Sequence, residues 1–331
     1  MKKIIISIIL VISMISLIGC SNNKDVVATV DGEKVYMSEY NYYYSLSKLQ
    51  AEQSVSPEEV SKYWETEIDG KTAYEVLKEN AYNEMLDLRI TAKHAEKLGI
   101  TYDDEVLNLA KQFKSQLLSI APNESEFYKL TNTNDEAITA ISKLLAIRNK
   151  MIQQLMEKGE ISINEEEIKK SFNENYLKAQ HILFVNTDEQ NNPLSEETMA
   201  EKRKKAEEVL KRAKSGEDFT TLMNEFSEDP GSKSQPEGYV FTSGEMVAEF
   251  EDGTRALQIN EISGIVESYF GYHIIKRLPL SSETDNEAYQ TASQNLQSDI
   301  IFNYINSHIE EWKKDIEIIE SKDAINKLSY K

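Results

Sequence analysis

Cysteine is almost absent from the sequence, since Cys20 is the only one in 331 residues. A disulfide within one chain is therefore excluded, and the fold must be stabilised by its apolar core. Basic residues are also scarce, with 37 against 57 acidic residues. This excess of negative charge argues against nucleic acid as a partner, because an anionic phosphate backbone repels an acidic protein.

Several sequence patterns that carry chemistry are missing. The sequence has no glycine loop typical of nucleotide binding, no clustered metal ligands and no Ser/His/Asp set in a recognisable context. We therefore expect neither a metal nor another cofactor. A solute-binding protein is disfavoured as well, because the regular alternation of strands and helices typical of that class is lacking.

The long apolar run of the sequence lies at its N-terminus, where residues 4–18 follow Lys2 and Lys3. A basic end followed by an apolar run too short to span a bilayer comfortably is typical of a secretion signal. No later run approaches the length of a transmembrane helix. The sequence therefore predicts export of the chain.

The end of this run, Leu-Ile-Gly-Cys at residues 17–20, resembles the lipobox of bacterial lipoproteins. The resemblance implies a signal peptide over residues 1–19, a lipid on Cys20, a tether over residues 20–25 and a location on the extracytoplasmic face of the cell membrane. The alternative is a secreted protein whose Cys20 lies by chance near an ordinary cleavage site. A lone cysteine in an exported chain favours lipidation.

Residues 26–177 are predicted to form a helical domain that begins with a small pair of strands. Asp31-Gly32 stands between two β-prone runs and predicts a tight hairpin turn. Ser38 is expected to cap the helix that follows. Further helices are expected over residues 106–117 and 135–158, and a long one before them has apolar residues at steps of three and four, namely Leu77, Ala81, Met85, Leu88, Ala92 and Ala95.

Residues 178–278 mix short strands and helices and predict an α+β domain with one small antiparallel sheet. The run from 180 to 185 is expected to be a strand with His181 and Leu183 on one face. A helix capped by Ser195 and a shorter helix follow it. A loop rich in turn-forming residues then leads to further short strands, the last of which carries His273.

Four blocks of this region resemble the parvulin family of peptidyl-prolyl cis/trans isomerases. They are residues 179–185 (Ala-Gln-His-Ile-Leu-Phe-Val), 226–232 (Phe-Ser-Glu-Asp-Pro-Gly-Ser), 244–251 (Gly-Glu-Met-Val-Ala-Glu-Phe-Glu) and 270–276 (Phe-Gly-Tyr-His-Ile-Ile-Lys). The resemblance implies an enzyme that rotates X-Pro amide bonds. Such a rotation has a barrier of roughly 18–20 kcal/mol, and a catalyst for it needs an apolar, dry pocket and suitable hydrogen bonds, without nucleophile or metal.

The resemblance also implies roles for single residues. Met246 and Phe250 match the positions that form the proline pocket, and Tyr239 and Phe241 are expected to add apolar wall. The catalytic positions are His181 and His273, which match the paired histidines behind the pocket, and Asp229, which matches the position beside the twisting carbonyl; Ser227 is a further candidate for the same network. Each also has a structural interpretation, since a buried histidine is usually a core group and Met246 and Phe250 have the spacing of simple helical packing.

The sequence departs from the family in one block. Many parvulins read Gly-Gly-Asp-Leu-Gly-Trp-Phe where residues 235–241 read Gln-Pro-Glu-Gly-Tyr-Val-Phe. The leucine that helps to line the pocket therefore has no certain counterpart. Asp188 and Glu189 occupy the loop where phosphate-reading parvulins carry basic residues, so a preference for phosphoserine before proline is not expected.

Residues 27–35, leading into a helix, resemble the start of the chaperone domain of the SurA and PrsA families of extracytoplasmic folding factors. In those families the isomerase domain is inserted, so we expect the helix within residues 283–331 to return to the first domain with Trp312 at the contact. The partners implied are unfolded or newly exported polypeptides with X-Pro bonds. The apolar residues of this domain have core packing as the alternative interpretation, and His94 and His308 are expected to face solvent.

Two functions follow from these observations. The first is a membrane-anchored extracytoplasmic foldase that isomerises X-Pro bonds in exported proteins and assists their folding. The alternative is a holding chaperone whose parvulin-like domain has little or no activity, and residues 235–239 are the feature that separates the two. The oligomeric state stays open, with a homodimer as one option.

Overall fold

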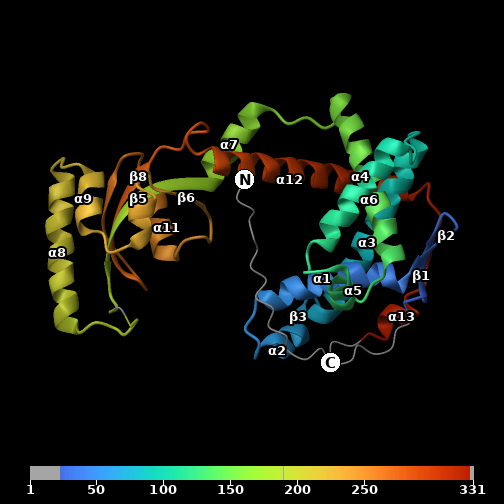
Figure 1. Ribbon diagram of the computed structural model, residues 1–331, viewed down its shortest axis with the longest axis horizontal. Coiled ribbons are helices and arrows are strands. Elements are labelled where there is room, and N and C mark those ends of the chain that lie inside the picture. The colour runs from blue at the N-terminus through green and yellow to red at the C-terminus, as the bar shows by residue number, and fades with distance from the viewer. Residues whose placement is uncertain (1–22, 189, 329–331) are drawn as a thin grey trace. The chain divides into compact units, whose positions relative to one another are not determined.

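The computed structural model describes residues 23–188 and 190–328, and the chain divides into two compact units. One, which we call the helical unit, comprises Met1–Ser162 together with Ile301–Lys331. The other, the sheet unit, comprises Ile163–Ile300 and is inserted into the helical unit along the sequence (Figure 1). This arrangement confirms the predicted fold class. The predicted signal peptide and Cys20 lie outside the described residues.

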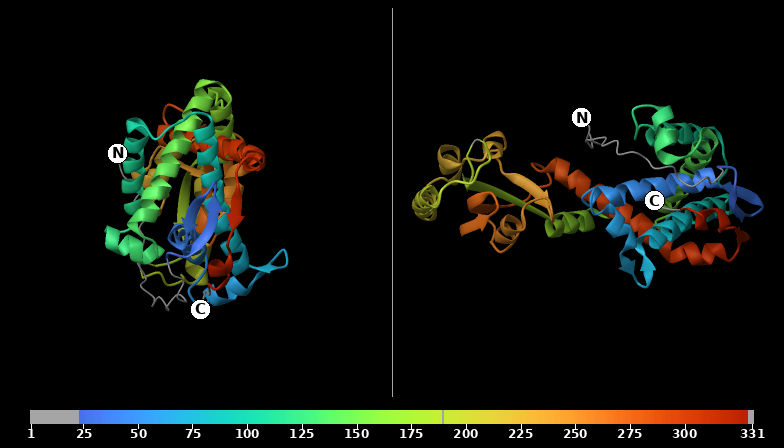
Figure 2. Two further views of the ribbon diagram at one scale, coloured as in Figure 1. Left: turned by 90° about the vertical axis from the view of Figure 1, so that its right-hand side faces the viewer. Right: turned by 90° about the horizontal axis from the view of Figure 1, so that it is seen from below.

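A three-stranded sheet joins the two sequence segments of the helical unit. β1 (Val26–Val30) and β2 (Glu33–Tyr36) form the predicted hairpin, with φ angles of 46° at Asp31 and 78° at Gly32. A strand that the sequence did not predict, β9 (Ile318–Glu320), pairs antiparallel with the other edge of β1 (Figure 2). The C-terminal segment is therefore hydrogen-bonded to the beginning of the helical unit.

Helices make up most of the helical unit. They are α1 (Met37–Gln53), α2 (Val60–Glu65), α3 (Ala73–Lys97), α4 (Asp104–Leu118), α5 (Glu124–Thr131), α6 (Asp135–Glu157), the C-terminal part of α12 (Asn286–Lys313) and α13 (Asp323–Asn326), with the short strands β3 (Glu67–Ile68) and β4 (Lys71–Thr72) between α2 and α3. The apolar stripe predicted for α3 is buried, and this helix ends before Gly99, which has a φ of 86°. Among these helices, none that the structure describes is long and apolar enough to cross a membrane.

Two sequence predictions for this unit are wrong. Ser38 does not cap α1, because β2 runs directly into a helix that already begins at Met37, and the Ser38 carbonyl instead accepts a hydrogen bond of 2.6 Å from Thr133 Oγ1. His94 and His308 do not face open solvent. Their rings stack on that of Trp312, with centroid distances of 4.3 and 5.8 Å respectively.

The sheet unit is built on four antiparallel strands in the order β6-β5-β8-β7. These strands are β5 (Tyr176–Val185), β6 (Tyr239–Thr242), β7 (Ile262–Ser268) and β8 (Gly271–Leu278). The helices are α7 (Glu165–Asn175), α8 (Glu196–Lys214), α9 (Phe219–Phe226), α10 (Pro230–Ser234) and α11 (Ala248–Arg255). Ser195 caps α8 as predicted, and Asn164 caps α7.

Alternation along β5 places different helices on the two faces of the sheet. Ile182 and Phe184 belong to a core cluster with residues of α8 and α9. Leu177 and Ala179 belong to a second cluster with Phe250 of α11. Figure 1 shows α8 and α9 on one side of the strands and α11 on the other. Because side chains alternate along a strand, His181 lies on the α11 face, as the sequence predicted for a residue out of phase with Ile182.

The ends of the sheet unit differ from the predicted limits at residues 178 and 278. α7 and the first part of α12 belong to this unit, because Phe172, Tyr176 and Ala292 form one buried cluster. A buried ion pair of 2.6 Å between Lys178 Nζ and Asp285 Oδ1 joins β5 to the residue before α12. The sequence predicts a helix within residues 283–331, but not that its first part packs in this unit.

Candidate active site

The α11 face of the sheet brings together side chains that lie up to 92 residues apart in the sequence. His181 projects from β5 and His273 from the neighbouring β8, where Leu183 pairs with His273 across the strands. Asp229 precedes α10 and caps it. Phe250 on α11 covers both imidazoles, with ring centroids 5.1 Å from His181 and 5.5 Å from His273.

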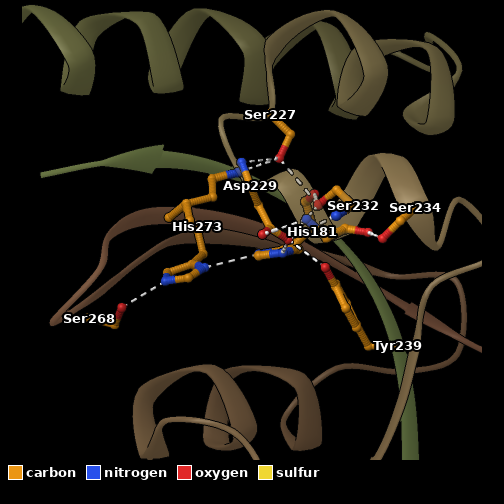
Figure 3. Close-up of polar contacts among 10 residues, drawn as sticks. His181, Ser227, Asp229, Ser232, Ser234, Tyr239, Ser268 and His273 are labelled. Carbon is orange, nitrogen blue, oxygen red and sulfur yellow. Dashed lines mark hydrogen bonds and ion pairs between the residues drawn. The ribbon is translucent and has the colours of Figure 1, made fainter. Parts of the chain in front are cut away.

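A continuous chain of polar contacts runs through the two histidines (Figure 3). Asp229 Oδ2 lies 2.8 Å from His181 Nε2, and His181 Nδ1 lies 3.1 Å from His273 Nδ1. His273 Nε2 in turn lies 2.7 Å from Ser268 Oγ. The two imidazole rings are nearly parallel, at 15°.

The direction of this chain follows from the chemistry of its ends. An ionised carboxylate only accepts hydrogen bonds, so His181 Nε2 carries a proton and donates it to Asp229. In a neutral imidazole the other nitrogen is then an acceptor, so His181 Nδ1 accepts from His273 Nδ1. His273 Nε2 consequently accepts from the hydroxyl of Ser268. Each histidine has one defined tautomer while both are neutral.

The Asp229 carboxylate is held ionised by its hydrogen-bond donors. Its Oδ2 accepts from His181 Nε2, Ser232 N, Ser232 Oγ and Tyr239 Oη, and its Oδ1 accepts from Gly231 N. The bond from His181 is the largest cause that holds the pKa of Asp229 well below its usual range, and it outweighs burial, which acts in the opposite direction. The site therefore contains a fixed negative charge that stays in place throughout the neutral range.

His273 is almost completely buried, with an exposure of 3%. Burial and, second, the nearby His181 lower the pKa of His273 to about 4, although Asp229 acts to raise it. Below the unfolded pKa of about 6.5 the unfolded state binds a proton that the folded state does not. The stability of the sheet unit should therefore fall as the pH drops from about 6.5 to about 4.

A pKa shift of this size corresponds to a loss on the order of 3 kcal/mol in the free energy of unfolding. We expect hydrogen exchange of the β5 and β8 amides, corrected for intrinsic exchange rates, to show about 2 kcal/mol of this loss between pH 7 and pH 5. The variant His273→Gln has no group to titrate and should show a flatter dependence. An equal slope in the variant and the parent protein would contradict the assignment to His273.

Apolar side chains form the wall opposite the polar chain. The rings of Phe241 and Phe250 have centroids 5.7 Å apart, and both residues are buried, with exposures of 1% and 3%. Met246, which is half-buried in the loop before α11, packs against the same cluster. The structure thus brings the predicted Met246, Phe250 and Phe241 together beside His181 and His273.

Tyr239 has a contact that the sequence did not predict. Its ring lies at the edge of His181, with centroids 5.6 Å apart, and its hydroxyl donates to Asp229 Oδ2 at 2.6 Å. Gly231 provides the space for this hydroxyl, because a Cβ at residue 231 would lie 2.0 Å from Tyr239 Oη. Tyr239 is therefore both part of the wall and a donor to the carboxylate.

Three serines complete the network, and only Ser227 was a candidate from the sequence. Ser227 Oγ accepts from Leu183 N at 3.2 Å and lies 3.3 Å from Ser232 Oγ, so it ties the loop before α10 to β5. Ser232 could have been found from the sequence, because it lies three residues after Asp229, which caps α10. Ser268 precedes a hairpin turn, and no local pattern in the sequence relates it to His273.

The described part of the chain holds no group of three or more His, Cys, Asp or Glu side chains arranged to bind a metal ion. The arrangement has instead the features of a site that acts through shape and charge. It offers apolar rings, one fixed carboxylate and two imidazoles whose four ring nitrogens all have hydrogen-bond partners. Groups of this kind can hold an apolar ring while a fixed charge acts on the polar group next to it.

Comparison with known proteins identifies both units. Residues 161–278 match the family of PPIC-type peptidyl-prolyl isomerase domains, and residues 1–138 match the SurA-like N-terminal domain. The foldase protein PrsA of Caldanaerobacter subterraneus is 29% identical over 313 residues, which cover 90% of this chain and 89% of that protein. Foldase protein PrsA 4 of Bacillus cereus is 26% identical over 300 residues, covering 90% of this chain and 85% of the relative.

Among solved structures, the parvulin of Nitrosopumilus maritimus is 37% identical to this chain. The match covers 32% of this chain and 97% of the parvulin, with a TM-score of 0.24. The match to the PPIC-type family identifies the sheet unit as a parvulin-type peptidyl-prolyl cis/trans isomerase domain, and the chain is an enzyme of that class. With its SurA-like domain in addition, the chain belongs to the PrsA-type foldases.

Proposed function

We propose that this foldase is held by a lipid on Cys20 at the extracytoplasmic face of the cell membrane, where it isomerises X-Pro bonds in newly exported polypeptides. The convergence of Phe250, both histidines and Asp229 on one face of the sheet is the observation that carries the catalytic part. The lipid anchor has its support in the residues around Cys20.

In this proposal the proline ring packs against Met246, Phe250 and Phe241, which exclude water from the amide. Asp229 then lies beside the carbonyl oxygen of the X-Pro bond. The resonance form that gives the amide its double-bond character places negative charge on that oxygen. A fixed carboxylate nearby disfavours this form relative to the twisted amide and so lowers the rotation barrier.

The two histidines act as positioning residues. Their hydrogen bonds run from Ser268 to Asp229 and leave no strong donor free to protonate the substrate. They fix the carboxylate and support the ring of Phe250. A rotation reaction needs no proton transfer and no covalent intermediate, so imidazoles whose ring nitrogens are all hydrogen-bonded are suited to this role.

One observation favours the alternative function of a holding chaperone with a weak isomerase. Gly238 lies in the block that departs from the parvulin pattern, and it has a φ of 94°. A Cβ there would lie 2.8 Å from the carbonyl oxygen of Ala179, so this backbone has no room for a larger residue. The wall must therefore be completed by Tyr239, whose ring replaces aliphatic surface with an aromatic edge.

A proline-peptide isomerisation assay on the purified protein separates the two functions. Catalysis above the uncatalysed rate that is lost in Met246→Ala supports the foldase with an active isomerase. Rates equal to background, together with suppressed aggregation of an unfolded client, support the holding chaperone. Metabolic labelling with a fatty acid, which Cys20→Ser should abolish, tests the anchor, and sedimentation velocity tests for the homodimer.

A further inference from the structure

The hairpin turn between β7 and β8 exposes two aromatic side chains. Tyr269 is 80% exposed and Phe270 is 50% exposed, and their rings contact edge to face with centroids 5.6 Å apart. We call these two residues the aromatic turn. Single exposed apolar residues are common on proteins, but two adjacent large ones beside a functional site are characteristic of a binding surface.

The backbone of the aromatic turn is held by hydrogen bonds, whereas its two side chains are exposed. Asn186 N donates to Phe270 O at 3.1 Å, and Asn186 Nδ2 donates to Tyr269 O at 2.7 Å. Phe270 N donates to Ser268 Oγ at 3.1 Å. Gly271 closes the turn with a φ of 130°, and a Cβ there would lie 2.1 Å from Phe184 O. Binding to such a surface loses little backbone entropy.

The aromatic turn is also continuous with the isomerase site. Ser268, the residue before Tyr269, forms the hydrogen bond of 2.7 Å to His273 Nε2. The ring of His273 in turn contacts Phe250 in the proline wall. The turn and the proline wall are therefore joined through the contacts of Ser268 and His273.

We propose that the aromatic turn binds a large apolar side chain of the client that lies close in sequence to the isomerised proline. The turn carries no charge of its own, and its two rings offer apolar area with π-edges, which suits an aliphatic or aromatic partner. The client chain is the occupant because the turn is joined to the site that holds it. This inference rests on the proposed function and adds a sequence preference to it.

The experiment compares two proline peptides of equal length, one with phenylalanine and one with serine beside the X-Pro dipeptide. Isomerisation is followed by NMR exchange spectroscopy, which needs no coupled protease, and binding by anisotropy of the same peptides carrying a dye. We expect Tyr269→Ser/Phe270→Ser to lower kcat/KM and affinity for the phenylalanine peptide by about five- to tenfold. For the serine peptide both quantities should stay within about twofold of the parent protein.

Ile259→Ser is the matched control, because Ile259 is 57% exposed in the same unit and contributes nothing to the site. It should leave both peptides unaffected. Equal losses on both peptides in the turn variant would overturn the inference, since they would place the effect on Ser268 and His273. Unchanged kinetics would also overturn it, and a changed sedimentation coefficient would then assign the turn to self-association.

The failure of the proposed function has a different signature. It would appear as an absence of catalysis by the parent protein on either peptide. In that case the binding measurement still decides the inference, because affinity for the phenylalanine peptide must fall selectively in the turn variant. Equal affinities of parent and variant would overturn it without reference to turnover.

Discussion

We expect Asp229→Ala to lower kcat/KM for X-Pro isomerisation by about a hundredfold, the usual cost of removing one electrostatic group from a preorganised site. The carboxylate accepts five hydrogen bonds, so its loss leaves His181, Ser232 and Tyr239 without their common acceptor. The negative charge proposed to act on the amide oxygen disappears at the same time. The isomerisation assay with a short proline peptide measures the change.

A more conservative substitution in the same network separates the effect of the negative charge from the effect of its positioning. Tyr239→Phe keeps the carboxylate and removes one donor, so about a tenfold loss is expected from a hydrogen bond to a charged group. Gly231→Ala should have the same effect, because its methyl group would displace the Tyr239 hydroxyl. The double variant should be no worse than either single one, since both remove the same bond.

Hydrogen exchange of the β5 and β8 amides provides the folding control for these variants. Protection similar to the parent protein shows that the sheet unit is folded and that a loss of activity is local. If Asp229→Ala stays within twofold of the parent in kcat/KM, the carboxylate has no electrostatic role in rotation. The apolar wall alone would then account for catalysis.

Much of the fold was predictable because its signals are local. The Asp31-Gly32 turn, the caps at Asn164 and Ser195 and the apolar stripe of α3 each depend on residues within a few positions of one another. The hydrogen bonds and dihedral angles that produce these features are formed within a single element. Their physical cause is therefore visible in a short window of sequence.

Contacts between distant segments were not predictable in the same way. β9 has only three residues and pairs with β1 across almost the whole chain. The stacking of His94 and His308 on Trp312 depends on how α3 and α12 pack, and periodicity reports a buried face without naming its partner. For this reason the sequence does not predict that His94 and His308 lie against Trp312.

The candidate site shows the same division. The resemblance in sequence named His181, Asp229 and His273, and the structure places them in one hydrogen-bonded chain. Ser268 and the hydroxyl contact of Tyr239 were not predicted, because both depend on distances across the sheet. For Tyr239 the sequence indicated apolar wall, whereas the additional bond to Asp229 follows from the small size of Gly231.

Arg89→Met is expected to destabilise the helical unit by about 3–5 kcal/mol, the range for breaking a buried ion pair by removing one partner. Arg89 Nε and Nη2 donate to the two carboxylate oxygens of Glu39 at 2.7 and 2.6 Å. The two side chains are only 8% and 4% exposed. Without the guanidinium, the Glu39 carboxylate would be buried with no charge to compensate it.

Tryptophan fluorescence during urea unfolding measures this change selectively, because the two tryptophans, Trp64 and Trp312, both lie in the helical unit. Lys150→Met is the matched control. It breaks a pair of 2.6 Å with Glu105, whose side chain is 67% exposed, and should cost less than about 1 kcal/mol.

The double variant Glu39→Leu/Arg89→Met decides between two explanations of the destabilisation. If the cost comes from an uncompensated charge, removing Glu39 as well should recover most of the lost stability, because an apolar pair can replace a buried ion pair of similar volume. If the double variant is as unstable as Arg89→Met, the cost instead comes from lost packing of the long arginine side chain. Short-peptide isomerisation should be unchanged in either case, since every residue of the candidate site belongs to the sheet unit.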